Sequence, residues 1–257
     1  MLGRWWRARR IERVLARRAI PDALWNATLA AYPFIAHRCS ADRERLRTLA
    51  TVFLADKEFT GANGLVITDA MAVAIAAQAC LPVLEIGLGL YARTVGIVVQ
   101  PGEVLARRHV TDEDTGLVHE YDEVLAGEAM EGGPVMLSWQ DVHAAGTSAD
   151  AGYNVVVHEF VHLIDMADGI ADAMPPLPDA AARRHWALVI EAAYTRFCRT
   201  LEAGQDTFLD PYGAEAIEEF FPVAAEAFFV APEALRAEQP QLYELFVGYF
   251  RQDPARR

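Results

Sequence analysis

Apolar positions in the first third of the chain repeat with the period of a helix. Residues 20 to 55 predict helices because apolar side chains return about every 3.6 positions, as at Leu46, Leu49, Val52 and Phe53. Short extended pieces are expected at Lys57 to Thr60 and at Gly64 to Ile67. A further helix, capped by Thr68 or Asp69, is expected through Cys80 and is apolar on most sides.

The pattern changes twice in the remainder of the chain. Runs rich in β-branched and aromatic residues predict strands at Val95 to Val99, Leu117 to Val124 and Pro134 to Trp139, which we expect to form one small sheet. From Asn154 onward the spacing predicts helices over residues 152–167, 179–203, 213–230 and 233–251. Strands followed by helices indicate an α+β fold with a small mixed sheet and a mostly helical C-terminal half.

Composition and charge divide the chain unevenly. Hydrophobic residues make up 53% of the 257 positions, which is typical of a packed globular protein. Residues 1 to 18 contain seven arginines and one glutamate, although the whole chain carries a net charge of -13. We therefore expect a basic helical segment over residues 1–45 and an acidic main domain over residues 46–257, together forming one compact body. An acidic body argues against nucleic acid as a partner.

Cysteine usage and hydropathy bear on the compartment. Cys39, Cys80 and Cys198 are widely spaced and form no CxxC pair, which indicates free thiols. The first twenty residues lack the apolar stretch of a signal peptide, and no run of about eighteen apolar residues predicts a transmembrane segment. The cytoplasm is the compartment that we expect.

The pentad His158-Glu159-Phe160-Val161-His162 carries the strongest chemical signal. Residues four apart on a helix project from one face, so His158 and His162 can offer two imidazole nitrogens to one zinc ion. Glu159 lies about 100° around the helix, where it can act as general base on a water molecule without being a ligand. The alternative is that both histidines are ordinary residues satisfied by hydrogen bonds, and the apolar neighbours of the pentad argue against it.

The third ligand has to come from another segment. Asp165 and Asp168 stand where the three-histidine pattern needs Gly and His, which excludes that pattern, and we expect Asp165 to support the helix or a ligand. Tyr212 and Glu219 are seven residues apart on an expected helix and would share a face. Glu219 is the favoured ligand, with Tyr212 as donor to the oxyanion, and Glu226 on the same stripe is the rival ligand.

Several longer segments resemble the Mlc titration factor A family of bacterial zinc-dependent peptidases, whose catalytic region is similar to the anthrax lethal-factor protease. The resemblance covers roughly residues 45 to 254 and rests on six segments: Gly64 to Asp69, Ile75 to Val83, Ala126 to Ala129, Gly133 to Trp139, Asn154 to Asp165, and Glu219 to Phe221. The chain departs from the pattern at Val161 and Tyr153, neither of which is an expected ligand.

The resemblance implies a zincin-like, gluzincin-type site with one Zn2+ per chain. His158, His162 and Glu219 would be its ligands, Glu159 its base and Tyr212 the oxyanion donor, because the lethal-factor pattern of Tyr-Gly followed by Glu-Phe-Phe matches residues 212–213 and 219–221. It also implies aminopeptidase-like activity and a link to sugar uptake through binding of the Mlc transcriptional repressor.

Three functions therefore compete. The first is hydrolysis of a peptide or protein substrate, docked along Pro134 to Trp139 as the edge of the sheet. The second is a weakly catalytic or non-catalytic regulator that binds a repressor of the Mlc type. The third is a zinc hydrolase of non-peptide amides, which the same ligands would allow.

Overall fold

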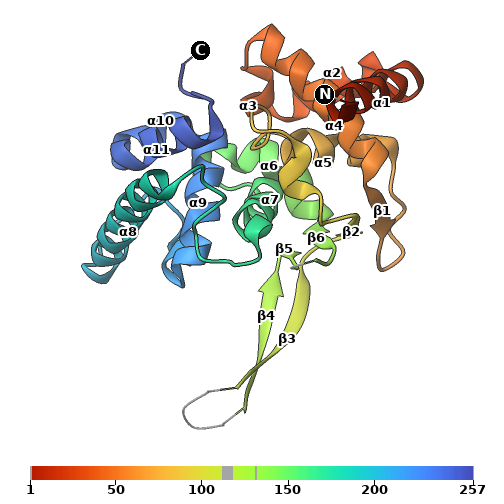
Figure 1. The fold of residues 1–257 in the computed structure, drawn as a ribbon. Helices are drawn as coiled ribbons and strands as arrows, with labels where there is room; N and C mark the ends of the chain where they lie inside the picture. Colours follow the sequence, from red (N-terminus) through yellow and green to blue (C-terminus); the bar gives the residue numbers. More distant parts are fainter. Residues whose placement is uncertain (1, 112–117, 131, 257) are drawn as a thin grey trace.

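The computed structural model describes residues 2–111, 118–130 and 132–256, and its α+β architecture surrounds one central helix (Figure 1). Helices precede, interrupt and follow a small sheet. The N-terminal helices are α1 (Leu2–Arg18), α2 (Asp22–Ala31), α3 (Pro33–Ala36), α4 (Ser40–Asp56) and α5 (Asp69–Ala79). The later ones are α6 (Trp139–Ser148), α7 (Val155–Asp165), α8 (Ala180–Glu202), α9 (Ile217–Val230), α10 (Pro232–Glu238) and α11 (Pro240–Phe250).

Four strands form the mixed sheet, in the order β1-β2-β6-β5. Their bounds are β1 (Glu58–Gly61), β2 (Gly96–Gln100), β6 (Val135–Ser138) and β5 (Gly127–Ala129). β1 and β6 both run parallel to β2, with Phe59 opposite Ile97 and Ile97 opposite Val135. β5 runs antiparallel to β6 and pairs Gly127 with Leu137. The predicted mixed sheet is confirmed.

The sequence prediction for the strands is wrong in two respects. The segment expected at 117–124 forms β4 (Val118–Leu125), which pairs only with β3 (Val104–Thr111) in a separate antiparallel hairpin that projects from the body (Figure 1). Leu117 lies outside the described residues. The segment expected at the sheet edge forms β6, which lies between β2 and β5, so the two edge strands are β1 and β5. A period-2 pattern shows that a segment is a strand, but not which strands are its neighbours.

Helix bounds differ from the prediction where the backbone changes direction. The helix expected over 213–230 is split into a 3-10 turn, η4 (Pro211–Ala214), and α9, with Ala216 extended between them. The helix expected over 233–251 is two helices, because Gln239 leaves the helical region and Pro240 begins α11. Gly64 to Ile67 forms no strand, and α6 was not predicted.

The core is built around α7. Phe160 on α7 packs against Phe53 and Tyr91, with ring centroids 5.6 and 4.9 Å away. α9 lies beside α7, and a cluster of aromatic rings joins α9 to α8 and α11 through Phe221, Trp186 and Phe246. α4 runs across residue 45 and packs against α1 and α5. Among the described residues, no helix has the length and apolar character that a membrane crossing needs.

Candidate metal centre

α7 begins at a capped end inside the core. The side chain of Asn154 accepts a hydrogen bond from the backbone N–H of Val157 at 2.9 Å, which satisfies one of the unpaired donors of the first turn. Ten of the eleven residues of α7 are buried, and His162 is half-buried. A helix anchored in this way presents His158 and His162 rigidly, one turn apart, on the side that faces α9.

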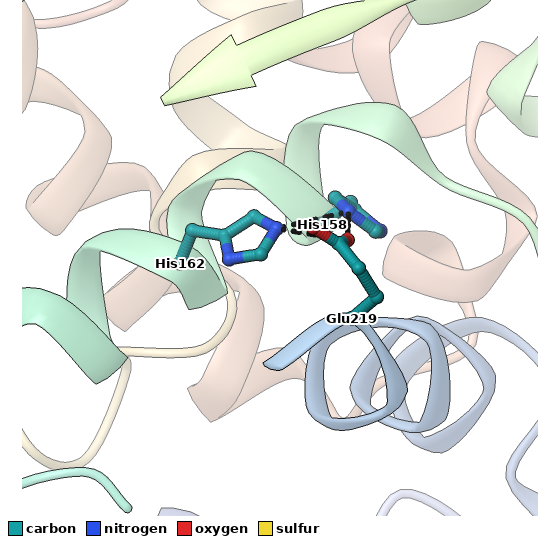
Figure 2. Close-up of side chains that lie close together, drawn as sticks. All are labelled: His158, His162 and Glu219. Atoms are coloured by element: carbon teal, nitrogen blue, oxygen red, sulfur yellow. Dashed lines mark hydrogen bonds and ion pairs between the residues drawn. The ribbon is translucent and has the colours of Figure 1, made fainter. Parts of the chain in front are cut away.

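Three side-chain atoms converge between α7 and α9, as Figure 2 shows. Nε2 of His158 lies 3.1 Å from Nε2 of His162. Oε2 of Glu219, in the first turn of α9, lies 3.2 Å from the first of these nitrogens and 3.3 Å from the second. The structure therefore brings together the three residues that the sequence predicted as ligands.

The dimensions and chemistry of this triangle fit a metal ion. A tetrahedral zinc ion with ligand distances of about 2.0–2.2 Å holds its ligand atoms about 3.3–3.6 Å apart, close to the spacing of these three atoms. A neutral His158 that donates its Nδ1–H would direct the lone pair of Nε2 toward the carboxylate of Glu219. Two such lone pairs face each other favourably only when a cation lies between them. Two imidazoles and one carboxylate form a typical zinc-binding set.

Glu226, the rival ligand, contacts the opposite side of the His158 ring. Its Oε1 lies 2.7 Å from Nδ1 of His158, and its Oε2 accepts the backbone N–H of Asn154. Burial raises the pKa of Glu226 above its ordinary value, although its bonds to His158 and Asn154 oppose the shift. Glu226 is therefore placed to orient the imidazole, a role that buried carboxylates have beside metal-bound histidines.

A chain of buried amides continues from Glu226 toward the N-terminal helices. The side chain of Asn154 donates to Oε1 of Gln78 at 2.8 Å. Gln78 is fully buried on α5, and its proximity to the Tyr32 hydroxyl opposes the rise in the Tyr32 pKa that burial causes. Tyr32, at the corner between α2 and α3, donates to the carbonyl of Val142 at 3.0 Å. Hydrogen bonds thus link the candidate metal centre to Gln78 on α5 through Glu226 and Asn154.

Glu159 lies on the sheet side of α7, directly against β5. A Cβ atom placed on Gly127 would lie 2.5 Å from Oε1 of Glu159, so only glycine lets the strand pass this close to the carboxylate. Burial raises the pKa of Glu159 to about 7, and the nearby His158 and His162 limit that rise. A carboxylate whose pKa is close to neutrality can both accept and release a proton at that pH.

Charges around the triangle favour a cation. Burial by itself lowers the pKa of His158, but its bonds to Glu219 and Glu226 raise that pKa well above its ordinary value. For Glu219, burial raises the pKa, yet the two imidazoles lower it far below its ordinary range. Positive charge at this position is therefore stabilised by the surrounding carboxylates.

Tyr212 reaches the site by a route that differs from the predicted one. It lies on η4, where Asp210 caps the turn by accepting the Tyr212 N–H at 2.9 Å. Because Ala216 interrupts the helix, Tyr212 and Glu219 do not share a helix face, and the predicted reason for their proximity is wrong. The Tyr212 ring nevertheless lies 6.0 Å from the ring of His158, measured between centroids, and is partly exposed.

Asp165 closes the other end of α7. Its Oδ2 accepts the N–H of Ala173 at 2.9 Å, while the carbonyl of Ala173 accepts Trp186 Nε1–H at 2.7 Å. Ala173 has a φ of 58°, in the left-handed region that costs a non-glycine residue about 1 kcal/mol or more. Asp165 thus ties the loop after α7 to the helix, in line with the supporting role expected for it.

A cavity of about 180 Å³ opens beside the triangle. His158 and Glu159 form one end of it, Ala126 and the first residue of β5, Gly127, form one wall, and α9 contributes Val223. The arrangement places Glu159 and a candidate metal site at the wall of a space that a small ligand or side chain can enter.

Some of these residues escaped the sequence analysis. Gly127 gives no signal of its contact with Glu159, because the two residues are far apart in sequence. Gln78 does carry a signal, since it is the one polar residue of α5 after Asp69 in the first turn, and such residues usually have buried partners. Glu226 was recognised only as a rival ligand, because spacing along α9 does not show which ring nitrogen it faces.

Similar proteins extend over almost the whole chain. A family model described as glucose-regulated metallo-peptidase M90 matches residues 3–251. An uncharacterised protein of Synechocystis sp. is 34% identical over 95% of this chain and 88% of its own length. Mlc titration factor A of Pectobacterium atrosepticum is 34% identical over 91% of this chain and 87% of its own length.

Mlc titration factor A of Serratia proteamaculans is 35% identical, covering 91% of this chain and 89% of the relative. The matches include the helix with both histidines and the helix with Glu219, and they leave only the chain ends outside the family model. The chain belongs to the glucose-regulated metallo-peptidase family M90.

Proposed function

We propose that the chain is a zincin-like peptidase of the gluzincin type, with one zinc ion bound by His158, His162 and Glu219. The observation that supports this most directly is the triangle of two Nε2 atoms and one carboxylate oxygen, 3.1–3.3 Å apart, with Glu159 beside it. Family membership supports a metallopeptidase, and the ligand set favours zinc.

When bound, zinc would acidify a water molecule and polarise the carbonyl of the scissile amide. Glu159 would accept the proton of the attacking water and pass it to the leaving amine, because its carboxylate lines the same cavity as His158. Tyr212 would donate its hydroxyl to the developing oxyanion, because its ring lies beside His158 at the partly exposed side of the site. Glu226 would keep His158 in the orientation that presents Nε2.

In this proposal, an extended peptide substrate docks along the open edge of β5. Ala126 accepts the Ser138 N–H and Met130 donates to Pro134, so alternate residues face β6. Gly127 and Ala129 therefore direct their N–H and C=O groups to the opposite side, where no described strand pairs with them. An extended peptide paired there would pass directly over Glu159. β5 thus takes the docking role that the sequence analysis assigned to Pro134 to Trp139, because β6 lies inside the sheet.

Replacing Glu159 by Gln tests the proposal. We expect zinc content to stay at one per chain and kcat/KM for peptide cleavage to fall by about 10²–10⁴-fold, because the base is lost while the ligands remain. Glu215→Gln, at an exposed site before α9, is the control and should leave both unchanged. Cleavage that persists in Glu159→Gln, or a wild-type protein that binds no zinc, contradicts the peptidase proposal.

Capture of a transcriptional repressor of the Mlc type is the second candidate function. It is favoured by the names of two relatives, Mlc titration factor A from Pectobacterium and Serratia. Binding of a repressor should persist in Glu159→Gln, whereas hydrolysis should not, so the same variant separates the two functions.

Two substrate profiles test the remaining alternatives. Cleavage of non-peptide amides distinguishes a general amide hydrolase from a peptidase. Comparison of free and N-terminally blocked peptides tests the aminopeptidase-like mode.

The cytoplasm remains the compartment that we propose. Cys39, Cys80 and Cys198 are free, and free thiols are typical of reducing compartments.

A further inference from the structure

The cavity beside Glu159 has an apolar interior and a polar end. Phe208 and Leu209 from the loop before η4, with Val223 and Ala227 from α9, supply its apolar lining. His158 and Glu159 stand at the polar end. A space that is apolar away from the reactive groups is typical of a pocket for a substrate side chain.

The charged groups of the lining do not make it a pocket for a charged side chain. Glu226 already uses both oxygens, one toward His158 and one toward the Asn154 N–H. Asp210 is exposed, and its Oδ1 accepts the Tyr212 N–H. Among the residues that the structure describes, no lysine or arginine lines the cavity, so an acidic side chain would lie near Glu226 and Asp210 without a basic partner from either residue type. Its interior therefore suits an uncharged, apolar group.

The volume limits the size of that group. An apolar protein cavity of about 150 Å³ is large enough to bind benzene. The cavity here measures about 180 Å³, so it can hold a phenyl ring or a branched aliphatic chain. A Cβ on Gly152 would lie 2.9 Å from Cε1 of Phe208, which shows how closely the Phe208 ring is packed against this wall.

The position of the cavity relates it to the scissile bond. Ala126 and Gly127, where the chain enters the edge strand β5, form one wall of the cavity, and His158 and Glu159 line its polar end. A peptide paired with β5 has alternate side chains on the side of the sheet that faces α7. One of these side chains, next to the scissile bond at Glu159, would enter the cavity.

We infer that this cavity is the specificity pocket of the site and that its substrates are peptides with an apolar side chain of leucine, methionine or phenylalanine size beside the scissile bond. The inference rests on the proposed peptidase function. It adds a substrate class to that function, and the residues that set the preference are Phe208, Leu209, Val223 and Ala227.

Two variants change the pocket in opposite directions. Ala227→Leu adds bulk to its α9 wall, and we expect kcat/KM for peptides with phenylalanine at the recognised position to fall about 10–200-fold, with little change for alanine. Phe208→Ala enlarges the pocket from a half-buried loop position and should shift the preference toward tryptophan. Ala192→Leu, at an exposed position of α8, is the matched control and should leave the profile unchanged.

A binding measurement complements the cleavage profile. Calorimetry with zinc-loaded Glu159→Gln protein should give tighter binding of peptides with leucine or phenylalanine than of the same peptides with glycine, and Ala227→Leu should remove the difference. Thermal unfolding and zinc content of each variant show that the fold and site are retained, and Phe208→Ala gives an independent answer if Ala227→Leu misfolds.

The outcomes separate the pocket from the peptidase function. A flat profile, or a preference for charged side chains, with cleavage that still depends on Glu159 overturns the pocket and leaves the peptidase function standing. An apolar preference that neither variant alters overturns the assignment of this cavity. Absence of any Glu159-dependent cleavage removes both proposals.

Discussion

Glu219 and Glu226 lie seven residues apart on the same face of α9, but they contact different atoms of the candidate metal centre. Glu219, in the first turn, has a side chain 24% exposed and lies among the Nε2 atoms of both histidines. Glu226, two turns later, is 4% exposed and contacts Nδ1 of His158. The two carboxylates thus lie on opposite sides of the same imidazole, one where a ligand belongs and one where an orienting group belongs.

The pKa values of the two glutamates move in opposite directions. The two imidazoles outweigh burial and lower the pKa of Glu219, whereas burial dominates at Glu226 and raises it. Exposure, the number of histidines contacted and the low dielectric of the core account for the difference. The comparison teaches that helical spacing selects candidates for a site, while burial and partners assign their roles.

Glu219→Gln should have the largest effect on metal binding in this comparison. The change removes the only carboxylate of the triangle, and we expect the zinc affinity to fall by more than 100-fold, which is beyond the range for a group that only orients a ligand. Competition with a chromophoric chelator measures it. The metal-free protein should also lose free energy of unfolding at neutral pH, because the imidazoles that lower the pKa of Glu219 stabilise its carboxylate in the folded state. A variant that still binds zinc tightly would remove Glu219 from the ligand set.

Glu226→Gln should affect both metal affinity and folding. Its amide oxygen can still accept the Asn154 N–H, but the site loses a buried carboxylate partner of His158. We expect zinc affinity to fall about 10–100-fold.

The free energy of unfolding of metal-free Glu226→Gln should fall by about 1–3 kcal/mol, as seen when a buried polar group loses its partner. Urea titration measures this change, and Glu215→Gln serves again as control. Should zinc affinity fall further in Glu226→Gln than in Glu219→Gln, the roles assigned to the two turns of α9 are reversed.

Gln78→Leu should have the smallest effect on the metal. It leaves the Asn154 side-chain N–H without its buried acceptor, which we expect to cost about 1–3 kcal/mol of unfolding free energy. Zinc affinity should change by less than in Glu226→Gln, because Gln78 acts on His158 only through Asn154 and Glu226. Gln140→Leu, at an exposed position of α6, is the matched control. Unchanged stability would show that the amide chain does not support the Glu226 turn.

Local patterns predicted a large part of this structure. The α+β class follows from the order of strand and helix patterns, and the approximate position of α7 follows from the helical spacing that begins at Asn154. The pentad placed His158 and His162 on one face because a helix returns to that face every four residues. Glu219 was chosen from spacing and resemblance, and the structure brings it to the two histidines.

Contacts between distant segments could not be predicted in the same way. The edge was assigned to residues 134–139, yet β5 occupies it, since strand order depends on how the chain crosses over. Tyr212 was placed near Glu219 for a helical reason that the extended Ala216 contradicts. The contact between Gly127 and Glu159 depends on the packing of β5 over α7, which no local pattern records.

By itself, the sequence determined which chemistry the protein carries: two imidazoles one turn apart, an adjacent carboxylate and a second helix with two glutamates, because a helix repeats at a constant angle. Only the tertiary structure decided which glutamate faces Nε2 and which faces Nδ1, and which strand passes over Glu159. Those choices depend on how α9 and β5 pack against α7, and packing is set by the shape and burial of residues far apart in the chain.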